Sequence, residues 1–272
     1  SYTEGRAPNI FKDQSYITMW NETSMLEMLL EERQGEIAAL LMEPICINGG
    51  GIMPDEGYLE EVTELCKEYG VLLIFDEVIT GVRCGLGGAQ SLFGVTPDIT
   101  VYGKAVAGGA VPVSVIMGRR DIMDMYTNFR AIHGGTFNGY PLGMAAVNAT
   151  IDILAAEGDY FTRVSEKANR IIDAFRRTAA EHGVPLSIQG PPTGITFHVN
   201  EDELDSSLQF GKELLKKNLL MNIIALDHGI IFSPISRMYS NIQLSDADVE
   251  FFEERIGDVM KAYCEVCDEV TA

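Results

Sequence analysis

Hydrophobic and polar positions along this chain alternate between a helical period of about 3.6 residues and short, almost continuous apolar runs. Helical periodicity covers residues 22–33 and 56–69, and strand-like apolar runs cover residues 36–43 and 71–75. Gly70 ends the second helix immediately before the second run. Because helices and strands follow one another in this order, the pattern predicts a mainly parallel sheet covered by helices.

The next part of the chain is richer in glycine. A glycine-rich stretch over residues 81–94 leads to a short expected strand at residues 99–102, and an apolar segment follows at residues 111–117. A helix is expected to begin after Asn138-Gly139-Tyr140-Pro141 and to continue through Leu154. These elements extend the α/β pattern to about residue 155.

The remaining sequence has a different texture, with longer helical segments. The expected elements are a helix at residues 160–182, a strand at residues 195–199, a helix at residues 206–217, short strands near residue 223 and at residues 230–232, and a helix after Ser245-Asp246-Ala247-Asp248. We therefore predict two domains, a large α/β domain over residues 1–155 and a smaller C-terminal α+β domain over residues 156–272.

The composition excludes several classes of protein. With 272 residues, of which 46% are hydrophobic, the chain can bury a sizeable core. Twenty Lys and Arg against 40 Asp and Glu give a formal net charge of −20, an acidic surface that repels nucleic acid and anionic membranes. No apolar run approaches the ~20 residues of a membrane span, and the first residues lack a signal-peptide pattern. We therefore predict a cytoplasmic protein without nucleic-acid or membrane partners.

The five cysteines are expected to be reduced thiols, because their number is odd and they are spread through a mid-sized chain. Cys264 and Cys267 have the spacing of a zinc or redox pair. No second pair of cysteines or histidines accompanies them, and a structural zinc site needs four ligands. No metal site is expected.

Lys104 and Asp76 carry the most informative chemistry. Asp76 follows the apolar run of residues 71–75, and Lys104 comes 28 residues later among glycine, alanine and valine. These neighbours indicate a buried lysine, whose amine can lose its proton and attack an aldehyde. A carboxylate at the end of a buried strand can keep a ring nitrogen protonated. The pair therefore suggests a pyridoxal phosphate site.

Each of these residues permits another interpretation when taken alone. An aspartate after an apolar run can simply end a strand, and a single lysine is more often a surface residue. Asp76 and Glu77 after an apolar run also resemble the magnesium-binding strand of P-loop ATPases. That class requires a G-x-x-x-x-G-K-[ST] loop, and here Lys104 is followed by Ala105. The pair is convincing only together with the motifs around it.

Four short motifs surround the pair in a fixed order. They are Ile74-Phe75-Asp76-Glu77-Val78-Ile79-Thr80-Gly81-Val82-Arg83, Gly87-Gly88-Ala89-Gln90, Gly94-Val95-Thr96-Pro97-Asp98-Ile99-Thr100 and Gly103-Lys104. Together they resemble the class III, fold type I pyridoxal phosphate aminotransferases, and within them the branch of glutamate-1-semialdehyde aminomutase and the β-amino-acid transaminases. The similarity is strongest over residues 36–150. It implies that the large domain binds pyridoxal phosphate.

The resemblance implies a role for each matching residue. Lys104 would form the Schiff base with the cofactor and later move the proton between substrate and cofactor. Asp76 would bond the pyridine nitrogen, Val78 would press on one ring face, and Glu43 would lie on the floor of the pocket. Thr136 matches a threonine that reaches the cofactor phosphate of a neighbouring subunit, so a homodimer is the expected working unit.

Other positions depart from the family pattern or match it weakly. Many ω-transaminases place a second glutamate five residues after the one matched by Glu43, and here that position is Asn48. Arg237 lies where some relatives bind a carboxylate, although the surrounding motif differs. Arg83 is interpreted as stabilising its own loop, and His133 as either a pocket residue or a locally bonded loop residue.

Family members also carry a long segment ahead of the position of Ser1. It includes a loop that binds the cofactor phosphate at a helix N-terminus and an aromatic residue over the other ring face. The resemblance therefore implies that the large domain is incomplete at its N-terminus. The chain would then be a fragment, part of a larger protein or a split enzyme.

Three functions remain open at this point. The first is a pyridoxal-phosphate-dependent aminotransferase, which moves an amino group between a small amino donor and a carbonyl acceptor. The second is an aminomutase, which moves the amino group within one molecule. The third is a non-catalytic fragment retained for dimerisation or assembly.

Overall fold

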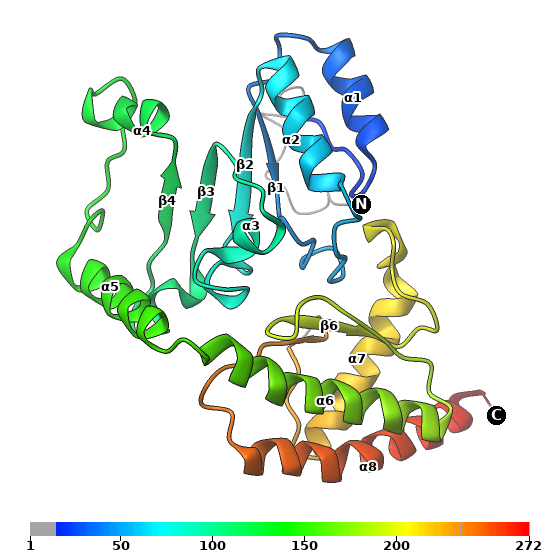
Figure 1. Cartoon of the computed structure of the whole chain (residues 1–272). Coiled ribbons are helices and arrows are strands. Elements are labelled where there is room, and N and C mark those ends of the chain that lie inside the picture. Colours follow the sequence, from blue (N-terminus) through cyan, green and yellow to red (C-terminus); the bar gives the residue numbers. More distant parts are fainter. Residues whose placement is uncertain (1–14, 234, 272) are drawn as a thin grey trace.

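The computed structural model of the chain describes residues 15–233 and 235–271 and contains two β-sheets, each with its own helices (Figure 1). The strands of the first sheet, in spatial order, are β1 (Ala39–Met42), β2 (Leu72–Glu77), β3 (Ile99–Tyr102) and β4 (Val115–Gly118). The first three are parallel and β4 is antiparallel to β3. The prediction of a mainly parallel sheet is confirmed.

Two helices, α1 (Thr23–Glu32) and α2 (Tyr58–Tyr69), cover one face of this sheet. Alternate side chains of β2 point toward them, and Leu73 and Phe75 are buried there. The helical residues in the same apolar cluster are Leu26, Leu30, Leu59, Val62, Leu65 and Cys66. The opposite face is less covered, because Leu41 is 64% exposed. The helical period of the sequence thus fixes which face of the sheet becomes core.

Five further elements complete the described residues of the first part of the chain. They are η1 (Gly81–Arg83), α3 (Gly88–Phe93), η2 (Lys104–Ala107), α4 (Arg120–Thr127) and α5 (Pro141–Ala156). The sequence did not indicate α3 or α4. Helix α3 is six residues long and begins at a glycine with a φ of +72°, so it lacks an amphipathic pattern that could reveal it.

The second sheet is antiparallel and is packed by long helices. Its elements are α6 (Tyr160–His182), β5 (Ser187–Gln189), β6 (Ile195–His198), η3 (Ser207–Gln209), α7 (Lys212–Asp227), β7 (Arg237–Met238) and α8 (Asp246–Thr271). Four aromatic rings, those of Phe175, Phe197, Phe232 and Phe252, contact one another in its core. Helices α6 and α8 lie side by side under this sheet (Figure 1).

Two expectations for this second part are wrong. The residues near Ile223 belong to α7, and residues 230–232 form no strand; the third strand is β7 instead. Met221, Ile224 and Ala225 are the buried residues of that region, at helical spacing. The helix expected at residues 206–217 is also split, because Ser206 and Gln209 cap a separate turn before α7 begins.

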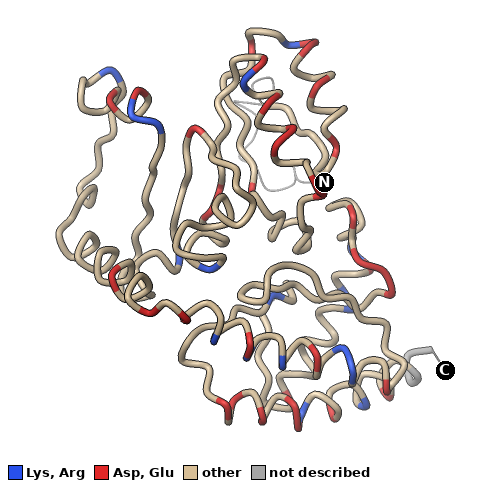
Figure 2. The backbone as a smooth tube through the Cα atoms, in the orientation of Figure 1, with Lys and Arg blue, Asp and Glu red and all other residues tan. Residues whose placement is uncertain are grey.

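Many of the acidic residues lie on the outer helices. Figure 2 shows Asp and Glu spread over α1, α2, α6 and α8. Within the described ranges, no helix is both long enough and apolar enough to cross a membrane. The cytoplasmic location and the domain boundary at residues 155 and 156 stay predictions.

Candidate active site

Three of the expected site residues lie at one edge of the first sheet. Glu43 directly follows β1, Asp76 is the fifth residue of β2, and Lys104 comes two residues after the end of β3. The parallel register pairs Met42 with Phe75 and Asp76 with Val101. Because parallel strands run in the same direction, their carboxyl ends bring these residues to a common edge. Ligands of open α/β sheets bind at this edge.

Val78 links the Asp76 strand to the Lys104 turn. Its backbone N–H donates a hydrogen bond of 3.0 Å to Asp76 Oδ1. Its side chain packs on Gly103, where an added Cβ would lie 3.2 Å from Val78 Cγ1. The side chains of Asp76 and Val78 are therefore fixed next to the residue that precedes Lys104.

Glu43 is held by Asn48 on the loop after β1. Asn48 Nδ2 donates to Glu43 Oε1 at 2.7 Å, and the Asn48 backbone N–H donates to both carboxylate oxygens at 3.3 Å. Burial raises the pKa of Glu43, and the nearby charge of Asp76 adds to that rise. The hydrogen bonds from Asn48 and the positive charge of Arg237 oppose it. Glu43 thus neighbours both Asp76 and the second sheet.

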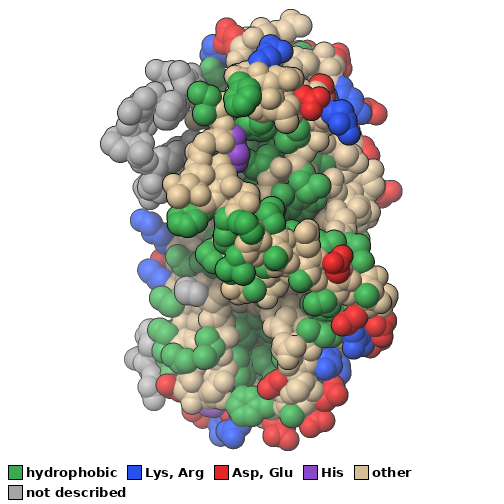
Figure 3. All heavy atoms as spheres, turned by 90° about the vertical axis from the view of Figure 1, so that its left-hand side faces the viewer, with side chains coloured by type: hydrophobic (Ala, Val, Ile, Leu, Met, Phe, Trp, Pro, Cys, Tyr) green, Lys and Arg blue, Asp and Glu red, His purple; other side chains and the backbone are tan. Residues whose placement is uncertain are grey.

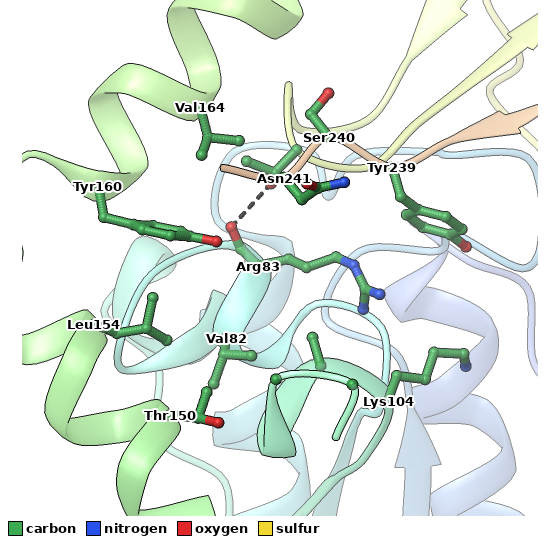
Figure 4. A pocket seen from close by; sticks show the side chains of 14 residues that line it. Val82, Arg83, Lys104, Thr150, Leu154, Tyr160, Val164, Tyr239, Ser240 and Asn241 are labelled. Atoms are coloured by element: carbon green, nitrogen blue, oxygen red, sulfur yellow. Dashed lines mark hydrogen bonds between the residues drawn. The ribbon is translucent and has the colours of Figure 1, made fainter. Parts of the chain in front are cut away.

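Lys104 is exposed in the single chain, so the prediction of a buried lysine is wrong. Its φ of +47° is in the left-handed region, at the first residue of η2. Because the chain turns out of the sheet there, the side chain leaves the sheet edge instead of entering the core. It lines a cavity of about 340 Å³. Figure 4 shows Lys104 and Arg83 extending from two turns on the same side of it.

A buried polar network holds the strands that carry Asp76 and Lys104. The carboxylate of Glu77 is fully buried and accepts hydrogen bonds from Thr80 Oγ1, from the backbone of Ala89 and from the backbone and side chain of Gln90. Gln90 Nε2 also donates to the hydroxyl of Tyr102. Strand β2 and strand β3 are tied together at this point. Sequence reasoning did not identify this role, since the donors depend on how the loop folds back.

The second sheet holds the loop that carries Asn48. His198 on β6 is fully buried, and its Nε2 donates to the backbone oxygen of Gly50 at 2.7 Å. The other ring nitrogen lies 3.3 Å from Asn218 Nδ2 and accepts from it. Gly50 has a φ of +127°, and a Cβ there would lie 2.9 Å from Leu204. His198, in its neutral form, therefore holds the loop of Asn48 and Gly50 on β6.

We expect His198→Gln to remove a pH dependence of stability. Burial lowers the pKa of His198 below the ordinary 6.5. Below that pH the unfolded chain binds the proton more readily than the folded chain, so wild-type stability falls as the pH falls. The slope approaches about 1.4 kcal/mol per pH unit. Gln can still donate to Gly50 but does not titrate, so its unfolding free energy should fall less between neutral and mildly acidic pH in denaturant titrations.

His182→Gln serves as the control, because His182 is exposed on α6. It should keep the wild-type slope. Equal slopes in the wild type and in His198→Gln would contradict the assignment of this pH dependence to His198.

Thr136 is not brought together with the other candidates. It is exposed on the segment between α4 and α5, beyond the β4 edge of the sheet (Figure 1). His133 lies on the same segment, where its ring contacts Tyr126 edge-on at 5.3 Å. The predicted role of Thr136 toward a neighbouring subunit stays a prediction.

The residues at the sheet edge fit the pyridoxal phosphate site that the sequence suggested. Lys104 offers an amine in an open cavity, and Asp76 offers a carboxylate on the neighbouring strand. Among residues 15–233 and 235–271, no three His, Cys, Asp or Glu side chains are grouped so that they could hold a metal ion. The arrangement suits an organic carbonyl cofactor held by an amine and an acid.

Comparisons with known proteins agree with this geometry. The model of the family "Aminotransferase class-III" matches residues 8–258. The glutamate-1-semialdehyde 2,1-aminomutases of Syntrophobacter fumaroxidans and Caldivirga maquilingensis are 35% and 37% identical, over 91% and 80% of this chain. The chain covers 58% and 50% of their lengths, so it spans about half of these curated relatives.

A solved structure gives the same result for the fold. An omega-transaminase from Sphaerobacter thermophilus matches with a TM-score of 0.83 and 27% identity, over 90% of this chain and 56% of that one. The structural neighbours are fold type I transaminases. The predicted fold class, a fold type I large-domain sheet joined to a smaller α+β part, is confirmed.

Proposed function

Because this chain belongs to the class III aminotransferase family, we propose that it transfers an amino group between a small amino donor and a carbonyl acceptor with pyridoxal 5'-phosphate as cofactor. The observation that carries the proposal is the placement of Asp76 and Lys104 at the ends of neighbouring parallel strands, with Val78 bonded to Asp76 and packed against Gly103, the residue before Lys104. If Asp76 only ended its strand, there would be no reason for an amine at the end of the next strand.

Each residue has a defined task in this proposal. When bound, pyridoxal phosphate supplies an aldehyde and a ring that accepts electrons. Lys104 Nζ would hold the aldehyde of the cofactor and would carry a proton at that position. Asp76 would keep the ring nitrogen protonated, and Val78 would support one ring face. Glu43, held by Asn48, lies on the β1 side of Asp76.

The test is reconstitution of the chain with pyridoxal phosphate. We expect a visible absorbance, and a pyridoxyl group fixed on Lys104 after borohydride reduction and peptide mapping. Pyridoxine phosphate, which lacks the aldehyde, is the matched control and should give neither signal. A chain that stays colourless and unlabelled would favour the non-catalytic fragment.

An aminomutase is the second candidate. Both curated relatives described above are named as aminomutases of glutamate-1-semialdehyde. In addition, Asn48 stands where a second acid would form a switch, and it bonds Glu43 instead. A single amino-aldehyde supplied without an external acceptor separates the two reactions. Isomerised product indicates the mutase, whereas a reaction that stops after one turnover indicates the transaminase.

We further propose that the working unit is a homodimer joined through the segment that carries Thr136. Apolar side chains gather on this face of the molecule (Figure 3). The most exposed of them are Phe129, Ile132, Phe137 and Leu142. Monomers rarely leave such a group of large apolar side chains open to water.

Ile132→Asp is expected to weaken the dimer roughly ten- to hundredfold, because Ile132 is 95% exposed in the single chain and a charge in its place could not be buried. Sedimentation across a concentration series measures the change. Leu208→Asp is the control, since Leu208 is exposed on η3, away from this face. A wild type that stays monomeric, or an Ile132→Asp chain that dimerises like it, would contradict the proposal.

A further inference from the structure

The cavity lined by Lys104 is cationic in an otherwise acidic protein. The chain has 40 acidic and 20 basic residues, yet the 14 described residues that line this cavity include Lys104 and Arg83 and no Asp or Glu. Hydroxyl and amide side chains make up much of the remaining lining: Thr150, Tyr160, Thr193, Tyr239, Ser240 and Asn241. A cavity with this lining favours an anion over a cation or a neutral amine.

Arg83 is held in place by contacts from both parts of the chain. Its Nη1 donates to the backbone oxygen of Ile79 at 2.8 Å, and its guanidinium lies over the ring of Tyr239 at 4.7 Å. Its own backbone oxygen accepts from Thr193 Oγ1 at 2.9 Å. The side chain therefore does stabilise its loop, as the sequence suggested, but that bond uses one of five N–H donors.

In the described part of the chain, no carboxylate pairs with the guanidinium of Arg83. None of the ion pairs among the described residues includes Arg83. Arg83 is partly buried, and burial lowers its pKa. A desolvated cation without a counter-charge is costly, and the cost is recovered when an anion binds. The free edge of a guanidinium matches a carboxylate in both geometry and charge.

We propose that Arg83 binds the carboxylate of the amino substrate in the cavity that Lys104 lines, so that the substrates are amino acids and not simple amines. The inference rests on the function proposed above. A carboxylate is preferred to the cofactor phosphate because Lys104 would be engaged with the cofactor aldehyde, which leaves one guanidinium to balance one negative charge, whereas a phosphate monoester carries nearly two. The volume of about 340 Å³ suits a small substrate.

The first experiment compares amines that differ only in the carboxylate. Chain loaded with pyridoxal phosphate is mixed with β-alanine or 4-aminobutyrate, and with ethylamine or propylamine as their counterparts. The measured quantity is the concentration that gives half-maximal loss of visible absorbance. Arg83→Met should raise it roughly ten- to hundredfold for the amino acids and by less than about twofold for the amines. Arg83→Lys should lie between.

Two matched variants distinguish carboxylate binding by Arg83 from the alternatives. Arg170→Met changes an exposed arginine paired with Glu253 and should behave as wild type. Arg237→Met tests the other arginine near the site, which acts on Glu43. If Arg237→Met, and not Arg83→Met, selectively weakened the binding of the amino acids, the proposal would be overturned. Weaker binding of pyridoxal phosphate, but not of pyridoxal, by Arg83→Met would assign Arg83 to the phosphate and also overturn it.

The second readout does not require the cofactor. At constant ionic strength, acetate replacing chloride should raise the thermal midpoint of the chain by roughly 2–4 °C at about ten times its dissociation constant. Arg83→Met should lose this rise, measured against the midpoint of the same variant in chloride. If the chain takes up no pyridoxal phosphate, the proposed function fails. The acetate experiment alone then tests whether Arg83 binds a carboxylate. No rise in the wild type would overturn the inference.

Discussion

Lys104→Ala is expected to abolish labelling by pyridoxal phosphate and to lower amino transfer by at least about 10³-fold. Among the residues that the structure describes, Lys104 is the only lysine that lines the cavity and the only one at the carboxyl edge of the sheet next to Asp76. No other amine among the lining residues can take its place. The visible absorbance, the pyridoxyl mass after borohydride reduction and the transfer rate all measure the loss.

The variant should fold normally, which makes the result interpretable. Lys104 is exposed, so its side chain contributes little to the core. The left-handed φ of +47° strains alanine about as much as lysine, so unfolding free energies should agree within about 1 kcal/mol. Lys104→Arg keeps the charge but not the nucleophilic amine and should be equally inactive. Lys67→Ala, on the exposed side of α2, should retain full labelling. Labelling of Lys104→Ala at the wild-type level would contradict the assignment of Lys104 as the reactive amine.

The sheet edge could be predicted because its residues follow strands that the sequence marks clearly. Leu73 and Phe75 are core residues of β2, so the strand and the acid at its end are visible in the apolar pattern. The surroundings of Lys104 could not be predicted in the same way. Small and apolar neighbours indicate burial, but the side chain's direction depends on the left-handed turn after β3, which the pattern does not reveal.

Contacts between distant segments explain why other features could not be predicted from the sequence. Gly50 and His198 are 148 residues apart, and Arg83 and Thr193 are 110 apart. Nothing local to either residue indicates its partner. Arg83 is therefore interpreted from the sequence as a loop residue, although in the structure it also faces the cavity. The same limit applies to α7, where adjacent isoleucines favour a strand locally while packing against β6 and α8 selects a helix.

Asp76→Asn is expected to lower amino transfer on the order of 10³-fold while leaving Lys104 labelled. The amide oxygen of Asn can still accept the Val78 N–H, so the local geometry should persist. The negative charge is lost, and with it the group that keeps the ring nitrogen protonated. Removing that charge also relieves its repulsion of Glu43, so stability should not fall.

A cofactor analogue methylated at the ring nitrogen makes this test specific. It carries the positive charge permanently and no longer depends on an acid to hold a proton there. It should restore much of the lost rate in Asp76→Asn and should bring no gain to the wild type. Asp173→Asn, an exposed change on α6, is the matched control and should be unaffected with either cofactor. If Asp76→Asn transfers amino groups at the wild-type rate with the natural cofactor, the electrostatic role of Asp76 is wrong even though Lys104 remains the reactive amine.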